Sequence, residues 1–458
     1  MEKIEEERII RLLNLNRLML LAGLPKPKER CRFLVILAFY LFAVTLRGAE
    51  PVPATPSIGV ADSFPNTSSS EYASNIGNTP PQFLYSKIHR IGLDYRPEYV
   101  LRTNDFIRGD YNDGRAITST QSVHLKYSFA FAKNTLCNLT YKGVYQGIGL
   151  VYQSFNESQH LGNPVSLYLF QGAKLLAFSP NFSFNYEWDF GLSFGWKPYN
   201  NLTNPNNVVI GSPVNAYMNL NFYLNYKLSS QLDLVSGVSV THFSNGNTKY
   251  PNAGLNTLGL RVGLVYTLGK HGDEASSGTL FRPIVPKFPQ HISYDCVLFG
   301  SWRRKGVLVG EERIASPYAY LVSGFNFAPM YNFGYIFRAG LSLDGVYDQS
   351  ANIYADPYIA GTNPDFQKPS WDKQLALGIS ARTELVMPYF RVNLGMGANF
   401  VGKDDQKGTY QVLALKIETS KSSFLHIGYN LKDFHIPNFL MLGIGYRFHD
   451  KYPTIHRK

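Results

Sequence analysis

Residues 182–197 read FSFNYEWDFGLSFGWK, and the alternation in this stretch indicates the fold class. Every second residue from Phe182 to Trp196 is large and apolar, and the residues between them are polar or small. A period of two over such a length predicts a β-strand, because successive side chains of a strand point to opposite faces of a sheet. A strand that is aromatic on one face and polar on the other is typical of a barrel that crosses a bilayer.

The same alternation continues along the chain. It is found at 88–100, 118–131, 146–155, 164–177, 182–197, 214–228, 231–244 and 256–268, and again at 290–304, 316–328, 332–347, 374–387, 389–401, 409–419, 422–431 and 438–449. The predicted fold class is all-β, an antiparallel up-and-down transmembrane β-barrel. The pattern leaves open one large barrel or two eight-stranded units, and both must close, because no free strand edge can face lipid. A soluble sandwich is the alternative, and it predicts shorter strands with a less aromatic face.

The composition agrees with a barrel. Aromatic residues make up 14% of the 458 residues, charged residues only 17%, and glycine is frequent at 39. The mean hydropathy is nevertheless slightly negative, which excludes a polytopic helical membrane protein. The net charge of +11 favours attraction to anionic lipid headgroups. Solvated loop charges are the plainer explanation, and no basic recognition helix for nucleic acid is present.

The N-terminal part has the pattern of a targeting segment. Residues 26–32 are basic, residues 33–46 are apolar, and Ala49 follows two positions after Arg47. This order predicts a secretory signal peptide. The predicted organisation is an N-terminal extension and signal peptide at 1–49, a disordered linker at 50–86, barrel strands with the functional motif at 87–268, a connection at 269–289, further barrel strands that form a possible degenerate repeat at 290–449, and a tail at 450–458.

Three cysteines are present. Cys31 precedes the apolar run, so it is not a lipoprotein acylation site. Cys137 and Cys296 remain after removal of the signal peptide. A disulfide between them is possible in an oxidising compartment, but the sequence does not show whether the two side chains meet. No spacing of metal ligands occurs, so neither a metal nor an organic cofactor is predicted.

The stretch 240–256, VTHFSNGNTKYPNAGLN, carries the candidate chemistry. His242 and Ser244 continue the apolar, lipid-facing stripe of the incoming strand, and Asn256 continues that of the outgoing strand. Polar residues that face lipid cost free energy and usually have a function. A histidine and a serine at positions i and i+2 stand side by side, as a base and a nucleophile do. Asn256 can orient the imidazole, as the asparagine of Cys-His-Asn enzymes does.

The turn between these strands offers hydrogen-bond donors. Asn245, Gly246 and Asn252 provide backbone and side-chain amides that suit an oxyanion hole or a substrate contact. The plainer interpretation is that a strand ends at the membrane interface, where polar residues and Asn-Gly turns are common.

Gly191–Gly195 also fits G-x-S-x-G, but Ser193 lies within a strand rather than at a nucleophile elbow.

The stretch HFSNGNTKYPNAGLN resembles the signature of PagL-type lipid A 3-O-deacylases. The resemblance implies an outer-membrane serine esterase with a lipid-facing triad, in which His242 is the base and Ser244 the nucleophile. Asn252 falls on a family position linked to the oxyanion hole. The family's acid position falls on Asn256, which is a departure, because an amide does not offset the imidazolium charge. The family's eight-stranded barrel does not explain the second half.

The predicted function is therefore removal of an ester-linked acyl chain from the lipid A of lipopolysaccharide, in the cell outer membrane. The predicted partners are lipopolysaccharide and outer-membrane lipids, with basic loop residues such as Lys249 near the phosphates, and no nucleic acid. One alternative is a non-catalytic outer-membrane barrel, either a pore or a lipid-binding structural protein, which Asn256 favours. Another is a porin-like channel made by all the strands.

Overall fold

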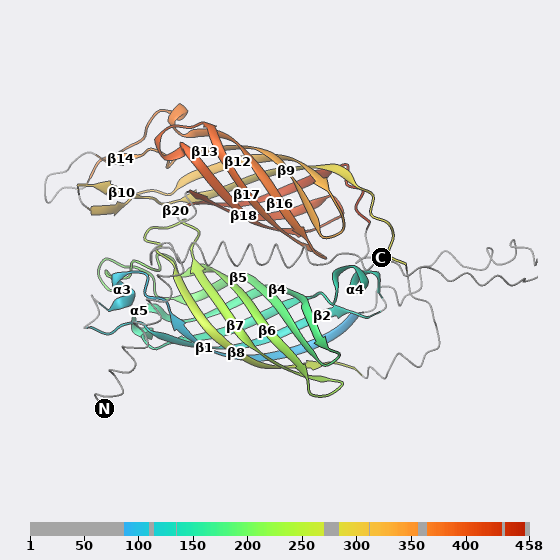
Figure 1. The fold of residues 1–458 in the computed structure, drawn as a ribbon. Helices are drawn as coiled ribbons and strands as arrows, with labels where there is room; N and C mark the ends of the chain where they lie inside the picture. Colours follow the sequence, from blue (N-terminus) through green and yellow to red (C-terminus); the bar gives the residue numbers. More distant parts are fainter. Residues whose placement is uncertain are drawn as a thin grey trace, which may run out of the picture. The chain divides into compact units, whose positions relative to one another are not determined.

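The structure is a computed structural model, and it describes residues 87–109, 114–133, 135–269, 284–310, 312–355, 364–432 and 436–453. The predicted signal peptide, the predicted linker and most of the predicted connection lie outside these residues. The strands close into two separate barrels of eight strands each (Figure 1). Of the two arrangements that the sequence allowed, the structure confirms two eight-stranded units.

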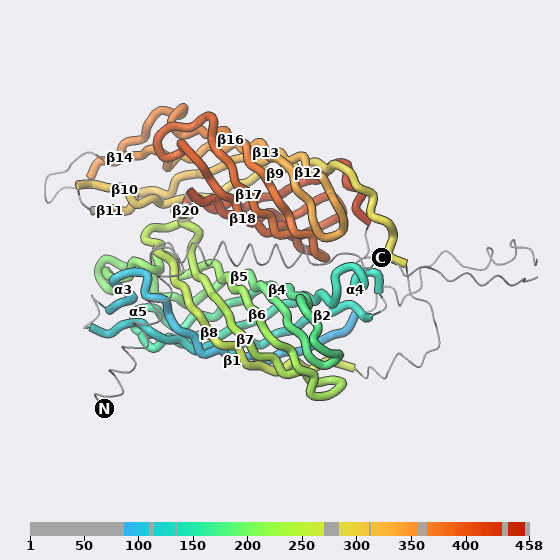
Figure 2. The backbone as a smooth tube through the Cα atoms, viewed as in Figure 1, coloured from blue at the N-terminus to red at the C-terminus, as the bar shows by residue number. Residues whose placement is uncertain are grey.

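The first barrel is an antiparallel meander in which each strand pairs with the next. Its strands are β1 Lys87–Val100, β2 Ser119–Phe131, β3 Tyr145–Phe155, β4 Gly162–Ser179, β5 Phe182–Trp196, β6 Val214–Lys227, β7 Leu232–Ser244 and β8 Leu255–Thr267. The barrel closes where β1 pairs with β8, with Tyr95 opposite Val262. The path can be followed strand by strand in the tube of Figure 2. Closure leaves no unpaired edge, as a strand in lipid requires.

The second barrel repeats this plan. Its strands are β9 His291–Arg303, β12 Tyr320–Asn332, β13 Phe337–Asp348, β16 Leu375–Val386, β17 Phe390–Val401, β18 Gly408–Glu418, β19 Ser423–Lys432 and β20 Ile436–Phe448. It closes where β20 pairs with β9, with Tyr446 opposite Cys296. The hairpin β19–β20 thus holds the same place in the strand order as β7–β8.

Short elements lie in the connections. They are the helices α3 Asp105–Arg108, α4 Leu136–Tyr141 and α5 Ser158–Leu161, the 3-10 turns η2 Trp371–Lys373 and η3 Asp404–Gln406, and the two-stranded sheets β10 Gly306–Val309 with β11 Glu312–Ala315 and β14 Tyr354–Ala355 with β15 Phe366–Gln367. The sequence did not predict the two small sheets. Among the described residues, no helix is long and apolar enough to cross a membrane.

In the first barrel, one end carries the connection 132–144, which contains α4, and the short turns 180–181 and 228–231. The connections 101–118, 156–161, 197–213 and 245–254 lie at the opposite end, which we call the long-loop end. Figure 1 shows α3 and α5 at this end and α4 at the other. β1 starts, and β8 finishes, at the end opposite the long loops. The ends of the two terminal strands and the short turns therefore share one side of the barrel.

The outward faces of the strands are apolar. On β8, Leu258, Leu260 and Val262 are about half exposed or more, whereas Thr257, Gly259 and Arg261 between them are buried. This is the period-two pattern of the sequence in three dimensions. An outer wall of Leu, Val, Tyr and Phe suits the hydrocarbon of a bilayer.

Charged side chains fill the middle of the first barrel's lumen. Arg261 reaches Asp94 at 2.9 Å and Glu187 at 2.9 Å, and Arg96 reaches Asp94 at 3.1 Å. Lys126 also pairs with Glu187. All five side chains are buried. An eight-stranded barrel is narrow enough for side chains to fill, and here ion pairs between β1, β2, β5 and β8 do so.

The second barrel has its own charged centre. Asp295 accepts hydrogen bonds from Arg447 at 2.7 Å and Lys416 at 2.7 Å, and Arg338 donates to it at 2.5 Å. Lys416 also contacts Glu384 at 2.8 Å. These side chains are buried as well. Neither lumen is an open channel at this level, so a porin-like pore made by the whole set of strands is not the architecture.

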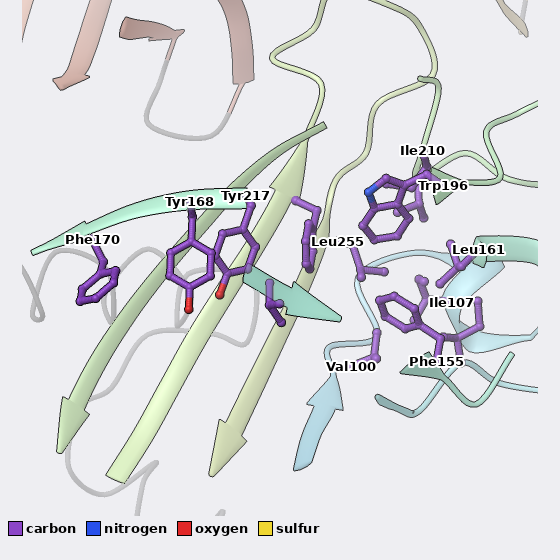
Figure 3. Packing of buried hydrophobic residues seen from close by; sticks show 14 of the residues in the cluster. Val100, Ile107, Phe155, Leu161, Tyr168, Phe170, Trp196, Ile210, Tyr217 and Leu255 are labelled. Atoms are coloured by element: carbon purple, nitrogen blue, oxygen red, sulfur yellow. The ribbon is translucent and has the colours of Figure 1, made fainter. Parts of the chain in front are cut away.

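Apolar side chains close the first lumen at the long-loop end (Figure 3). Trp196 packs on Phe155 with ring centroids 5.6 Å apart and on Phe243 at 4.8 Å. The sequence prediction placed Trp196 on the outward face of β5, and this is wrong. Gly195 has a φ of 88°, which interrupts the alternation, so Trp196 turns inward and donates a hydrogen bond to Ser193.

Candidate active site

The hairpin β7–β8 brings the predicted site residues together at the long-loop end. His242 lies directly opposite Asn256 in the strand pairing, and Ser244 is the last residue of β7. Their inward neighbours Thr241 and Phe243 are buried in the lumen. His242, Ser244 and Asn256 therefore lie on the outward face, because alternate residues of a strand point to opposite sides.

Asn256 holds the imidazole of His242. The Nδ1 atom of His242 lies 2.7 Å from the Oδ1 atom of Asn256. An amide oxygen only accepts, so this contact places the hydrogen of a neutral imidazole on Nδ1 and leaves Nε2 as an acceptor. The pairing sets the tautomer that a general base needs, without a carboxylate.

Ser244 is contacted by two donors from the turn that follows it. Asn252 Nδ2 donates to Ser244 Oγ at 2.9 Å, and the Gly246 amide donates to the same oxygen at 3.2 Å. Two donors thus converge on the oxygen of the candidate nucleophile. Within the described residues no hydrogen bond joins His242 to Ser244, although the two side chains stand on the same face two residues apart.

The turn 245–254 is fixed by its own hydrogen bonds. The Asn245 amide donates to Asn252 Oδ1 at 3.0 Å, and Asn245 Nδ2 donates to the Lys249 carbonyl at 2.7 Å. Gly246 and Gly254 have φ values of 67° and 73°, a region that glycine enters without a steric penalty. Asn245 is therefore used within the turn, where it fixes the amide of Asn252.

Two features of this site were not found from the sequence. At Gly254, a Cβ atom would lie 2.9 Å from His242 Cε1, so the backbone here lies directly against the imidazole. The neighbouring connection 197–213 supports the turn, since Val208 accepts a hydrogen bond from the Ala253 amide at 3.0 Å. Asn207 in turn accepts from the amides of Val209 and Ile210. The Asn-rich stretch 200–207 was the only signal in the sequence.

The other residues that the sequence singled out lie away from this site. Ser193 of the G-x-S-x-G match is buried in the lumen. Cys137 and Cys296 are both free thiols.

Comparison with protein families decides what this barrel is. The family model described as lipid A 3-O-deacylase (PagL) matches residues 122–265, which include His242, Ser244 and the whole turn. The first barrel therefore matches the PagL family. A second model, described as acyloxyacyl hydrolase, C-terminal domain, matches residues 292–450. The expectation that the family leaves the second half unexplained is therefore wrong, because a domain of this family accounts for the second barrel.

Solved structures of outer-membrane proteins are also similar. The outer membrane enzyme PagL shares 14% identity, covering 38% of this chain and 97% of its own, with a TM-score of 0.26. Neisserial surface protein A shares 10% identity, covering 39% and 97%, with a TM-score of 0.26. No curated protein matches the sequence. The two family models match the two barrels separately, and they indicate an outer-membrane protein.

The second barrel lacks the counterpart of the candidate site. β19 contains a histidine, His426, but this side chain is buried in the lumen. The residue two positions later is Gly428, so no His-x-Ser pair is formed. Within the described residues, the constellation of a PagL-type site is confined to the first barrel.

Proposed function

We propose that the first barrel is a serine esterase that removes an ester-linked acyl chain from lipid A. The observation that carries the proposal is the hydrogen bond between His242 and Asn256 beside Ser244, on the outward face of the barrel. The site therefore meets its substrate from the lipid side. An ester buried among acyl chains is the substrate that such a position suits.

The hydrolysis has two steps. A rotation of the Ser244 side chain toward His242 lets Nε2 accept the hydroxyl proton as Oγ attacks the ester carbonyl. The bond from Oγ to the acyl carbon forms, and the bond from that carbon to the sugar oxygen breaks. His242 returns the proton to the departing sugar hydroxyl. Water then attacks the acyl carbon while His242 accepts a proton from it. The bond from that carbon to Oγ breaks, His242 returns the proton to Oγ, and a free fatty acid leaves.

We infer that two donors stabilise the oxyanion. The Asn252 side-chain amide and the Gly246 backbone amide both donate to Ser244 Oγ, and once Oγ turns to attack the ester these donors are free to bond the carbonyl oxygen. Preorganised donors of this kind contribute about 2.7–4 kcal/mol each. Asn245 acts as a positioning residue, because it holds Asn252 rather than the substrate.

We infer that the site lies at the outer side of the membrane. Outer-membrane barrels carry their longer loops outside and their short turns in the periplasm. The site lies at the long-loop end, and lipopolysaccharide occupies the outer leaflet. The acyl chain would lie along the outward face of β7 and β8, where Val240 and Leu258 are exposed, and Lys249 would meet a phosphate.

Mass spectrometry of lipid A tests the proposal. A host that expresses the chain should lose one acyl mass from its lipid A. The Ser244→Ala variant at equal membrane level should leave lipid A intact. Ser236→Ala is the matched control, because Ser236 is outward-facing on the same strand but lies away from the turn. It should behave as the parent.

The second candidate is a non-catalytic lipid-binding barrel. The observation that favours it is Asn256 at the acid position, since an amide does not offset an imidazolium charge. Intact lipid A with the parent chain, correctly folded in the membrane, would decide for this candidate and against the esterase.

A further inference from the structure

Glu98 is a buried acidic residue in the lumen of the first barrel that the proposed reaction does not use. It is 6% exposed and lies on the inward face of β1, opposite Gly259 of β8 in the strand pairing. A Cβ atom at Gly259 would lie 2.6 Å from Glu98 Cγ, so the glycine leaves room for the acidic side chain to cross over β8. The carboxylate thereby reaches the strand pair β7–β8, which carries the candidate site.

The carboxylate of Glu98 is hydrogen-bonded to the two residues that adjoin His242 and Asn256. Thr241 is the residue before His242. Thr257 is the residue after Asn256, and it lies opposite Thr241 in the strand pairing. Both threonine hydroxyls donate to Glu98 Oε2, that of Thr241 at 3.3 Å. Because side chains alternate between the two faces of a strand, Glu98 lies on the lumen side of the strand pair that holds His242 and Asn256 on its lipid side.

Three hydroxyl groups in all donate to Glu98. The third belongs to Ser122 on β2, whose Oγ donates to Oε1 at 2.7 Å. Asn219 Nδ2 donates to Thr241 Oγ1 at 2.7 Å, which leaves the hydroxyl hydrogen of Thr241 for Glu98. An ionised carboxylate only accepts hydrogen bonds, so this set of donors suits the negatively charged form. The network holds that charge at a fixed position behind the site.

No basic side chain pairs with Glu98 in the part of the chain that the structure describes. Three other carboxylates of this lumen are matched by three basic residues. They are Asp94, Glu187 and Asp189, with Arg96, Lys126 and Arg261. His124 contacts the Ser122 oxygen at 3.0 Å and the Tyr168 hydroxyl at 2.9 Å, and a neutral imidazole makes both contacts. Glu98 therefore adds one uncompensated negative charge near the site.

The proposed reaction needs such a charge while the proton is on His242. The imidazole becomes a cation as Ser244 attacks the ester, and Asn256 orients the ring without offsetting that charge. A charge inside the barrel wall acts through protein and lipid, where the effective dielectric constant is far below that of water. A carboxylate on the other side of the strands therefore stabilises the cation, although less than a carboxylate in contact with it.

We propose that Glu98 supplies, through the wall of the first barrel, the negative charge that Asn256 does not. This inference rests on the proposed esterase function and deepens it. Glu98 touches neither the substrate nor His242, so it is a positioning residue rather than a catalytic one. It acts on the imidazolium, which exists only during the chemical steps. Its effect should therefore be on kcat and not on KM.

The rate of fatty-acid release from lipopolysaccharide vesicles that contain the full chain, measured across a range of pH, tests the proposal. Glu98→Gln should lower kcat about tenfold, the order of magnitude for a unit charge acting over about 10 Å at an effective dielectric constant of about 20. The pH of half-maximal activity on the acid side should fall by about one unit, because an imidazolium without this charge releases its proton more readily. A purely structural role of Glu98 would lower the rate equally at every pH.

Three further variants make the test specific. Glu98→Met, a second neutral replacement, should behave as Glu98→Gln does, whereas Glu98→Asp keeps the charge and should keep the parental pH profile. Asp233→Asn is the matched control, because Asp233 is an acidic residue at the opposite end of β7 whose carboxylate is bonded to Asn225. It should leave both kcat and the pH profile unchanged. Folding of each variant is checked by its shift on unheated gels.

A double variant separates charge from structure. In Asn256→Asp a carboxylate contacts the imidazole directly, so adding Glu98→Gln to that variant should lower kcat by clearly less than in the parent background. An equal loss in both backgrounds, or a Glu98→Gln variant with the parental kcat and pH profile, would overturn the inference and leave the esterase standing. A folded parent that releases no fatty acid would refute the proposed function, and this inference with it.

Discussion

Asn256 is the residue that distinguishes this site from the acid-containing pattern that its sequence resembles. It fixes the tautomer of His242 through Oδ1 but supplies no negative charge when the imidazole takes a proton. In serine proteases, exchange of the acid for an amide lowers kcat by about 10⁴-fold. The pair therefore has the hydrogen bond that orients His242, but it lacks the negative charge that would stabilise the protonated imidazole.

We expect Asn256→Asp to increase the deacylation rate. A carboxylate at this position would accept the same hydrogen bond and also stabilise the imidazolium. The gain should lie between about tenfold and the 10⁴-fold limit that the protease exchange sets. The rate of fatty-acid release from purified lipopolysaccharide measures it, with Asn256→Leu as the opposite control, in which orientation is lost. An Asn256→Asp rate at or below that of the parent would contradict this account of the departure.

Gly254→Ala should impair His242 specifically. The added Cβ would lie 2.9 Å from His242 Cε1, and the positive φ adds about 1–2 kcal/mol of strain. The expected result is a folded barrel with a deacylation rate lowered at least about tenfold, since a small misplacement of a catalytic group is costly. Gly269→Ala is the control, because Gly269 has a φ of 88° with open space around its Cβ. Equal loss in both variants would show that backbone strain alone is responsible.

At the scale of elements, the barrel strands were predictable because their side chains face either lipid or lumen. β16 differs from its predicted span by one residue at each end, and β17 by one residue at its start. The sheets β10–β11 and β14–β15 were missed, because strands of four and two residues have too few side chains to show a period. The position of Trp196 was missed because one glycine reversed the alternation.

The site was predictable in part for the same reason. The outward position of His242, Ser244 and Asn256 follows from the alternation of side chains along a strand alone. The hydrogen bonds of Asn245 and the close approach of Gly254 do not, because they depend on the path of an irregular turn. The ion pairs of the lumen could not be predicted from the sequence either, because the register between neighbouring strands determines which charged side chains meet.

Those ion pairs connect four strands of the first barrel, and Glu187 is central to them. Its carboxylate contacts Lys126 and Arg261 and accepts a hydrogen bond from Tyr145 at 2.8 Å. Glu187→Gln leaves Asp94 as the shared carboxylate of Arg261, Arg96 and Lys126, so buried positive charge is left in excess, which should cost about 3–5 kcal/mol. Urea unfolding in lipid vesicles, followed by gel shift, measures the loss. Glu157→Gln, in a loop and without a capping hydrogen bond, should change stability by less than about 0.5 kcal/mol.

At the scale of the whole molecule, two narrow barrels replace one wide one. Each lumen is crossed by buried ion pairs, and the first is also closed by the apolar cluster around Trp196. We therefore expect no steady conductance when the purified chain is inserted in planar bilayers. Single-channel recording measures this, with a porin as the positive control. Stable, voltage-independent current steps would contradict the lumen as described.

The outward position of the His242–Asn256 pair has a consequence for how substrate arrives. A site on the outer wall, rather than in a lumen or a cleft, is reached by lateral diffusion within one leaflet. Its encounter rate is then set by the mole fraction of lipopolysaccharide in the plane of the membrane, and not by its amount per volume of solution. Inert lipid mixed into the same vesicles would slow hydrolysis by surface dilution, whereas adding buffer would leave the rate per vesicle unchanged.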